Sequence, residues 1–123
     1  MPIFKTGNMF NAPGLKIVTT NSFITKKERL VMGRGAALEL RQLVPDIDLI
    51  FGRMIQESCG HLGLYGLLMN GQYGAAQVKY NFGDKANISL IAFSMAFLAD
   101  EAKTNHYIYN LNYPGIGNGG LDK

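Results

Sequence analysis

The chain has 123 residues, a net charge of +3 and 47% hydrophobic residues, which suits one globular domain and excludes a disordered tail. Its apolar stretches are far shorter than the ~18 residues that span a bilayer, and from its first residues we expect no secretory signal. The lone cysteine, Cys59, cannot form an internal disulfide, so nothing ties the protein to an oxidising compartment. We therefore expect a single domain over residues 1–123, located in the cytoplasm and without membrane contact.

The densest basic group is formed by Lys26, Lys27 and Arg29, in a polar segment that is predicted to be a loop. Charged side chains in such a segment usually belong to a loop that is exposed to solvent. A nucleic-acid groove is the alternative, although it would need more basic residues with aromatic side chains interleaved among them. The net charge of the whole chain favours the approach of anions only weakly.

The first half of the chain predicts one strand and two helices. Residues 15–20 are rich in β-branched side chains and follow a Pro-Gly turn, which indicates a buried strand. Apolar residues at spacings of three and four predict helices over 36–44 and 47–59, separated by Pro45. Asp46 is the expected N-cap of the second helix.

The second half predicts three strands and one helix. Residues 64–69 and 75–80 are predicted strands, joined across an Asn70-Gly71 turn, and 106–113 form the last strand. Between them a helix is expected from its cap, Asn87, to about residue 103; it is apolar on most sides and is therefore expected to be well buried. This alternation predicts a sheet covered on both faces, with ligands at the carboxyl ends of its strands.

Two glycine-rich segments offer backbone N–H groups to an anion. Gly33-Arg34-Gly35-Ala36 opens a predicted helix, whose first N–H groups have no helical partner. Gly115-Ile116-Gly117-Asn118-Gly119-Gly120, which follows Pro114, holds four glycines in six residues and suits an anion-binding nest. The alternatives are a plain tight turn for the first segment and a disordered tail for the second. The sequence has no P-loop, and Leu38 stands where a dinucleotide fingerprint needs glycine.

Three polar residues are candidates for binding or catalysis. Asn21 follows the first strand, and its amide suits ribose hydroxyls or, alternatively, a turn or helix cap. Asn8 lies in a turn, where a structural role is favoured. Lys79 is either a solvated edge residue or a lysine of lowered pKa that attacks the anomeric carbon of a sugar. The two histidines are far apart and no carboxylates pair, so we expect no metal and no other cofactor.

Four segments resemble the macrodomain family in their order and spacing, and the resemblance covers nearly the whole chain. They are Gly7-Asn8-Met9-Phe10, 17–22, 32–37 and 114–121. The form that the segments 32–37 and 114–121 take in this chain is similar to small phage and bacterial macrodomains and to the terminal ADP-ribose glycohydrolase subclass. This resemblance implies a three-layer α/β/α fold with a mixed sheet, here short at its C-terminal end.

The resemblance implies that the partner is ADP-ribose or an ADP-ribosylated substrate, with nucleic acid involved only as a modified substrate. Asn8 and Met9 would flank the adenine, although Asn8 replaces an aspartate that many macrodomains use there. Asn21 would bind the distal ribose, and Thr20 before it is also expected at the ligand. Gly33, Arg34, Gly35 and Ala36 would wrap this ribose and the pyrophosphate, and residues 114–120 would form the second phosphate loop.

The resemblance also assigns catalysis. Lys79 matches a lysine that forms a covalent adduct with the distal ribose in this subclass, so Lys79 and Asn21 are the expected catalytic residues for hydrolysis at C1. The subclass resolves the adduct with an aspartate, whose place here is nearest Leu121, with Asp122 one residue away. The alternative is therefore a non-catalytic module that sequesters ADP-ribose or a related signalling nucleotide.

Macrodomains usually continue past the second loop with a helix and a strand, whereas three residues follow Gly120 here. An open sheet edge is therefore expected to favour association with a second copy.

Overall fold

A computed structural model of the protein describes residues 9–59, 63–81, 83–105 and 107–111. In chain order its elements are η1 (Met9–Asn11), β1 (Leu15–Thr20), α1 (Gly35–Leu43), α2 (Ile47–Cys59), β2 (Leu67–Asn70), β3 (Tyr73–Gln77), α3 (Ile88–Asn105) and β4 (Tyr109–Leu111).

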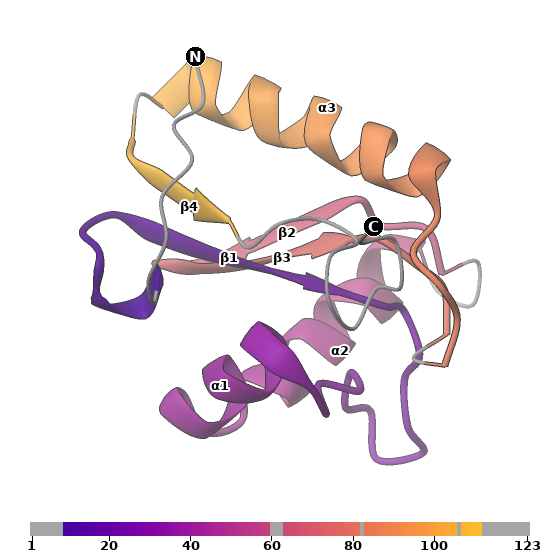
Figure 1. The fold of residues 1–123 in the computed structure, drawn as a ribbon. Coiled ribbons are helices and arrows are strands. Elements are labelled where there is room, and N and C mark those ends of the chain that lie inside the picture. Colours follow the sequence, from indigo (N-terminus) through magenta and orange to yellow (C-terminus); the bar gives the residue numbers. More distant parts are fainter. Residues whose placement is uncertain (1–8, 60–62, 82, 106, 112–123) are drawn as a thin grey trace.

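The described strands form one mixed sheet in the order β2-β3-β1-β4. β1 is parallel to β3 and to β4, while β2 and β3 form an antiparallel hairpin. Gly71, with φ 62°, supplies the left-handed residue of the hairpin turn. Helices α1 and α2 cover one face of the sheet and α3 covers the other (Figure 1). The predicted three-layer α/β/α fold is therefore confirmed.

The main core lies between the sheet and the pair α1 and α2. Leu40 of α1 and Phe51 and Ile55 of α2 are fully buried in one cluster with Val18 of β1 and Leu68 of β2. Their spacing along each helix places them on the face toward the sheet, as the apolar period predicts. Each such side chain stabilises the fold by about 1.5–3 kcal/mol through burial.

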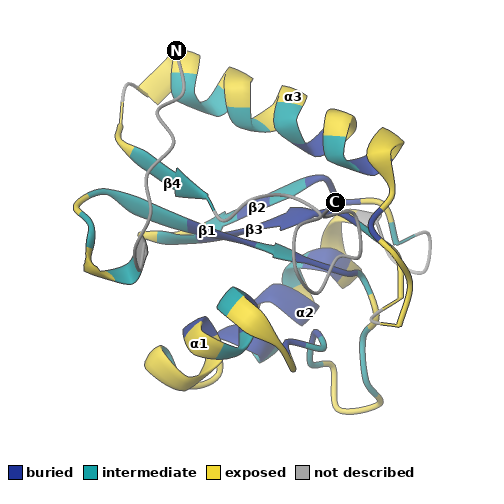
Figure 2. Cartoon of the chain, viewed as in Figure 1, coloured by how far each residue is buried: buried dark blue, intermediate teal, exposed yellow. Residues whose placement is uncertain are grey.

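The prediction that the last helix is well buried is wrong. In α3 only Leu90 and Ser94 are buried, whereas Ile88 is 73% exposed and Phe97 is 47% exposed. Within the described residues α3 lies alone on its face of the sheet, so only the side toward the strands is covered (Figure 2). An apolar composition predicted burial, but the number of neighbouring elements decides it.

The predicted helix boundaries and caps had different outcomes. Asn87 caps α3, since its Oδ1 accepts a hydrogen bond from the Leu90 N–H at 3.2 Å. Asp46 occupies the predicted N-cap position of α2, since its carbonyl accepts from the Ile50 N–H at 3.0 Å. Its φ is 68° rather than extended, and its carboxylate accepts from Arg29 at 3.0 Å. No helix in the described part of the chain combines the length and hydropathy that a membrane span requires.

Candidate functional site

The carboxyl ends of β1 and β3 lie beside each other, next to the start of α1 (Figure 1). We refer to this end of the strands as the edge. Thr20 pairs with Gln77 in the parallel register. Beyond that pair the Val78 N–H donates to the Thr20 carbonyl at 2.9 Å, and the Ser22 N–H donates to the Tyr80 carbonyl at 3.0 Å. The next residues on the two segments, Asn21 and Lys79, therefore lie at the same edge, where ligands bind in sheets of this kind.

Asn21 holds the loop that leads from β1 to α1. Its side-chain Nδ2 donates to the Val31 carbonyl at 2.9 Å, and its Oδ1 accepts from the Phe23 N–H at 2.8 Å. The residue is only 5% exposed. An amide has a second hydrogen and a second lone pair, so these bonds leave capacity for one further partner on each atom. The observed role of Asn21 is to position the loop.

Thr20 lies beneath the edge, buried against a tyrosine that sequence reasoning did not single out. The Tyr65 hydroxyl donates to the Asn21 carbonyl at 2.6 Å and also hydrogen-bonds with the Thr20 hydroxyl. Both side chains are buried. Tyr65 therefore fixes the end of β1 from below, and a single aromatic ring within a predicted strand gave no signal for this contact.

Gln77, at the end of β3, is fully buried and forms a second support that the sequence did not reveal. Its Oε1 accepts from the N–H groups of Tyr65 and Gly66 at 2.9 and 3.2 Å. Its Nε2 donates to the Gly63 carbonyl at 2.6 Å. One amide side chain thus holds residues 63–66 against the edge.

At the start of α1 the first backbone N–H groups have no acceptor among the described residues. Arg34 is the N-cap, with φ −147° and no capping bond from its side chain, and Gly35 has φ 59°. The Leu38 N–H donates to the Arg34 carbonyl at 3.2 Å, so the N–H groups of residues 35–37 precede the first helical bond. A Cβ added to Gly33 would meet no atom within 4 Å, which means that the space beside Gly33 is open.

The electrostatic environment of Lys79 includes the positive charge of Arg34. Burial lowers the pKa of the Lys79 ammonium, the positive charge of Arg34 lowers it further, and Asp84 acts in the opposite direction. The Lys79 Nζ donates to the Asp84 carbonyl at 3.2 Å. The structure thus brings together two predicted site residues that lie 45 positions apart in the numbering, Arg34 and Lys79, beside a helix N-terminus. This arrangement suits an anion.

The loop between β1 and α1 is fixed on α2. Arg29 forms ion pairs with Asp48 at 2.8 Å and with Asp46 at 3.0 Å. The backbone of Glu28 approaches α2 so closely that a Cβ on Gly52 would lie 2.0 Å from its carbonyl oxygen. Gly33 and Arg34 are therefore presented by a supported loop.

Several predicted site residues are not placed. Asn8 and the segment 114–120 lie outside the described residues, and so do Leu121 and Asp122. Met9 begins η1.

In the described sheet β2 and β4 are the edge strands, and association with a second copy through such a strand stays a prediction. Among the residues described, no group of three His, Cys, Asp or Glu side chains is arranged to hold a metal ion.

No protein-family model and no curated protein sequence matches the chain. Solved structures do match. The macrodomain of Mycobacterium tuberculosis DarG has a TM-score of 0.70 at 19% identity, over 97% of this chain and 80% of that one. Thermosipho africanus DarTG in complex with ADP-ribose has a TM-score of 0.71 at 18% identity, over 94% of this chain and 33% of that one.

The macrodomain of Thermus aquaticus DarG has a TM-score of 0.64 at 20% identity, over 94% of this chain and 78% of that one. Similarity at this level of identity establishes a fold. The resemblance inferred from the sequence is thus confirmed in three dimensions, and the chain has the fold of a bacterial macrodomain.

Proposed function

We propose that this chain binds ADP-ribose at the edge where β1 and β3 end. The observation that carries the proposal is the meeting of the ends of β1 and β3 with the start of α1, where the positive charge of Arg34 also lowers the pKa of Lys79. Two cations and a helix N-terminus together favour a diphosphate. A structural neighbour with the same fold was solved in complex with ADP-ribose, which supports the choice of ligand.

In this proposal the diphosphate lies over Gly33, Arg34, Gly35 and Ala36. The open space beside Gly33 lets a ligand approach the backbone there. We assign the second half of the diphosphate site to the glycine-rich segment 115–120, which follows β4, a strand parallel to β1. Asn8 and Met9 are assigned to the adenine and Asn21 to the distal ribose.

We further propose that Lys79 cleaves linkages at C1 of the distal ribose. A lowered pKa increases the fraction of neutral amine, which is the nucleophilic form. The Nζ atom attacks C1, the C1–O bond to the carrier breaks, and the departing oxygen takes a proton. Water then hydrolyses the N–C1 bond, which releases ADP-ribose and restores the free lysine.

Isothermal titration calorimetry with ADP-ribose tests the binding proposal. Arg34→Gln removes a charged partner of the diphosphate, so we expect an affinity at least about tenfold lower. Lys103→Gln, which removes an exposed cation from the last turn of α3, is the matched control and should bind like the wild type. Equal affinities of wild type and Arg34→Gln would refute this site.

A second candidate function is binding without hydrolysis. It is favoured by the sequence after the second loop, where Leu121 stands nearest the place of the resolving aspartate. Incubation with ADP-ribosylated DNA, ADP-ribosylated protein and ADP-ribose-1″-phosphate separates the two functions. Release of ADP-ribose from any of them supports catalysis, and tight binding without release supports the binding module.

A further inference from the structure

Three groups beneath the edge form a buried chain of hydrogen bonds, which runs from the Thr20 hydroxyl through the Tyr65 hydroxyl to the Asn21 carbonyl. The Tyr65 hydroxyl has one hydrogen and donates it to the Asn21 carbonyl at 2.6 Å. The Thr20 hydroxyl therefore donates to the Tyr65 oxygen, because that oxygen has no second hydrogen to give. Hydrogen bonds arranged head to tail polarise one another, so the Thr20 bond strengthens the bond that Tyr65 makes to Asn21.

Tyr65 is itself fixed on β3. Its backbone N–H donates at 2.9 Å to Oε1 of Gln77, which is the last residue of β3 and is fully buried. The chain of hydrogen bonds thus joins the end of β3 to the end of β1 through one phenol ring. Tyr65 is 8% exposed and Thr20 is 3% exposed, so neither side chain offers a surface to a ligand. Any effect of Tyr65 on binding therefore acts through the residue that it holds, Asn21.

Asn21 is held at three points. Tyr65 donates to its carbonyl, the Phe23 N–H donates to its Oδ1 at 2.8 Å, and its Nδ2 donates to the Val31 carbonyl at 2.9 Å. Asn21 is 5% exposed, so only a small part of it can meet a ligand. A small rotation of its peptide therefore decides whether the spare hydrogen and lone pair of the amide face a ligand hydroxyl.

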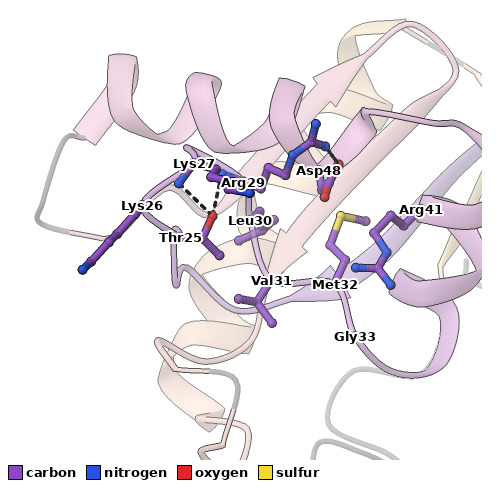
Figure 3. A pocket seen from close by; sticks show the side chains of 10 residues that line it. All are labelled: Thr25, Lys26, Lys27, Arg29, Leu30, Val31, Met32, Gly33, Arg41 and Asp48. Atoms are coloured by element: carbon purple, nitrogen blue, oxygen red, sulfur yellow. Dashed lines mark hydrogen bonds and ion pairs between the residues drawn. The ribbon is translucent and has the colours of Figure 1, made fainter.

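The loop beyond Asn21 has an anchor of its own. Val31 and Gly33 lie in the same segment as Arg29, which forms an ion pair of 2.8 Å with Asp48 of α2 (Figure 3). Gly33, which we assign to the diphosphate, is therefore expected to keep its place when the hold on Asn21 is weakened. This separates the part of the site that depends on Asn21 from the part that binds phosphate.

We propose that Tyr65 is a positioning residue, whose hydroxyl makes the site selective for ligands that carry a second ribose beyond the diphosphate. The inference rests on the proposed function, in which Asn21 binds that distal ribose. Ligands that end at the diphosphate do not reach Asn21, so their binding does not depend on Tyr65. A preorganised amide needs no reorientation when the ribose arrives, which is how a buried hydroxyl affects affinity without touching the ligand.

Isothermal titration calorimetry of the full chain with ADP-ribose and with ADP, which lacks the second ribose, tests the proposal. Tyr65→Phe keeps the ring and removes only the hydroxyl, so we expect the affinity for ADP-ribose to fall at least about fivefold while the affinity for ADP stays unchanged. Thr20→Val removes the donor behind Tyr65 and should give a smaller loss, again confined to ADP-ribose. Tyr109→Phe is the matched control, because it removes a hydroxyl that bonds to Glu101 at 3.0 Å beside the start of β1, and it should bind both ligands like the wild type.

A second measurement needs no ligand. The Phe23 N–H donates to Asn21 Oδ1, so its hydrogen exchange should be at least about fivefold faster in Tyr65→Phe and unchanged in Tyr109→Phe. An unchanged Phe23 exchange rate, wild-type affinity for ADP-ribose in Tyr65→Phe, or an equal loss for ADP and ADP-ribose would each overturn the positioning role. A wild type that binds no ADP-ribose would refute the proposed function instead, and the Phe23 exchange rate would still decide whether Tyr65 positions Asn21.

Discussion

Arg34, the N-cap of α1, lies close enough to Lys79, just past β3, to lower the pKa of its ammonium group. The effect is one of charge, and it links the two segments that sequence reasoning assigned to one ligand. Like charges repel, so this arrangement costs stability in the absence of an anion. A diphosphate placed between the two side chains would remove that cost, which is why we regard the pair as the centre of the site.

The first prediction concerns the pKa of Lys79. Arg34→Gln removes a positive neighbour, so the pKa of Lys79 rises toward its ordinary value. Because the neutral amine is the proposed nucleophile, the rise of hydrolysis with pH should move to higher pH in the variant. 13C NMR of reductively methylated lysines measures the pKa without any turnover, with Lys79→Arg used to assign the signal. An unchanged pKa would contradict the proximity of the two groups.

The second prediction separates binding from chemistry. Lys79→Ala removes the proposed nucleophile and should reduce release of ADP-ribose from a modified substrate to the uncatalysed rate, while ADP-ribose still binds. Lys85→Ala, which removes an exposed lysine nearby, is the control and should keep full turnover. Product release by chromatography and affinity by calorimetry give the two readouts. Full turnover in Lys79→Ala would remove this residue from the mechanism.

The third prediction contrasts two glycines of one segment. Gly33→Ala places a methyl group in open space, so the free energy of unfolding should stay unchanged while affinity for ADP-ribose falls. Gly35→Ala forces a Cβ into a backbone of φ 59°, which should lower the free energy of unfolding by about 1–2 kcal/mol. Urea denaturation and calorimetry on both variants check this. Wild-type affinity in Gly33→Ala would show that no ligand occupies that space.

The fourth prediction concerns the buried support beneath the edge. Gln77→Leu leaves the N–H groups of Tyr65 and Gly66 without their acceptor, and the free energy of unfolding should fall by roughly 2–4 kcal/mol. Gln72→Leu, in the exposed hairpin turn, is the matched control and should change stability by less than about 0.5 kcal/mol. Equal stability of the two variants would show that the Gln77 network contributes little.

Local patterns predicted those features of the fold that depend on neighbouring residues. The β-branched run of β1 and the apolar period of α1 and α2 gave the strand and both helices, because burial of one face repeats along each element. The Asn87 cap was also local, since its partner is three residues away. The cover of α3 was not local, and its exposed face contradicts the prediction from composition.

The candidate site was predictable in part for the same reason. Glycines at the start of α1 and a lysine after β3 are visible in the sequence, and the parallel register of β1 and β3 places Asn21 and Lys79 at one edge. Tyr65 and Gln77 were missed because their hydrogen bonds reach partners 11 to 45 residues away. Glutamine and tyrosine side chains have many roles in proteins, and only the three-dimensional structure shows that these two form buried hydrogen bonds.

The central claim is that two distant glycine-rich segments bind one diphosphate. A 1H–15N titration of the labelled full chain with ADP-ribose tests it most directly, because it reports both segments in one experiment. We predict that the amides of residues 33–36 and of residues 115–120 shift together along a single binding curve. Shifts confined to one segment, or two curves with different affinities, would contradict a shared diphosphate site.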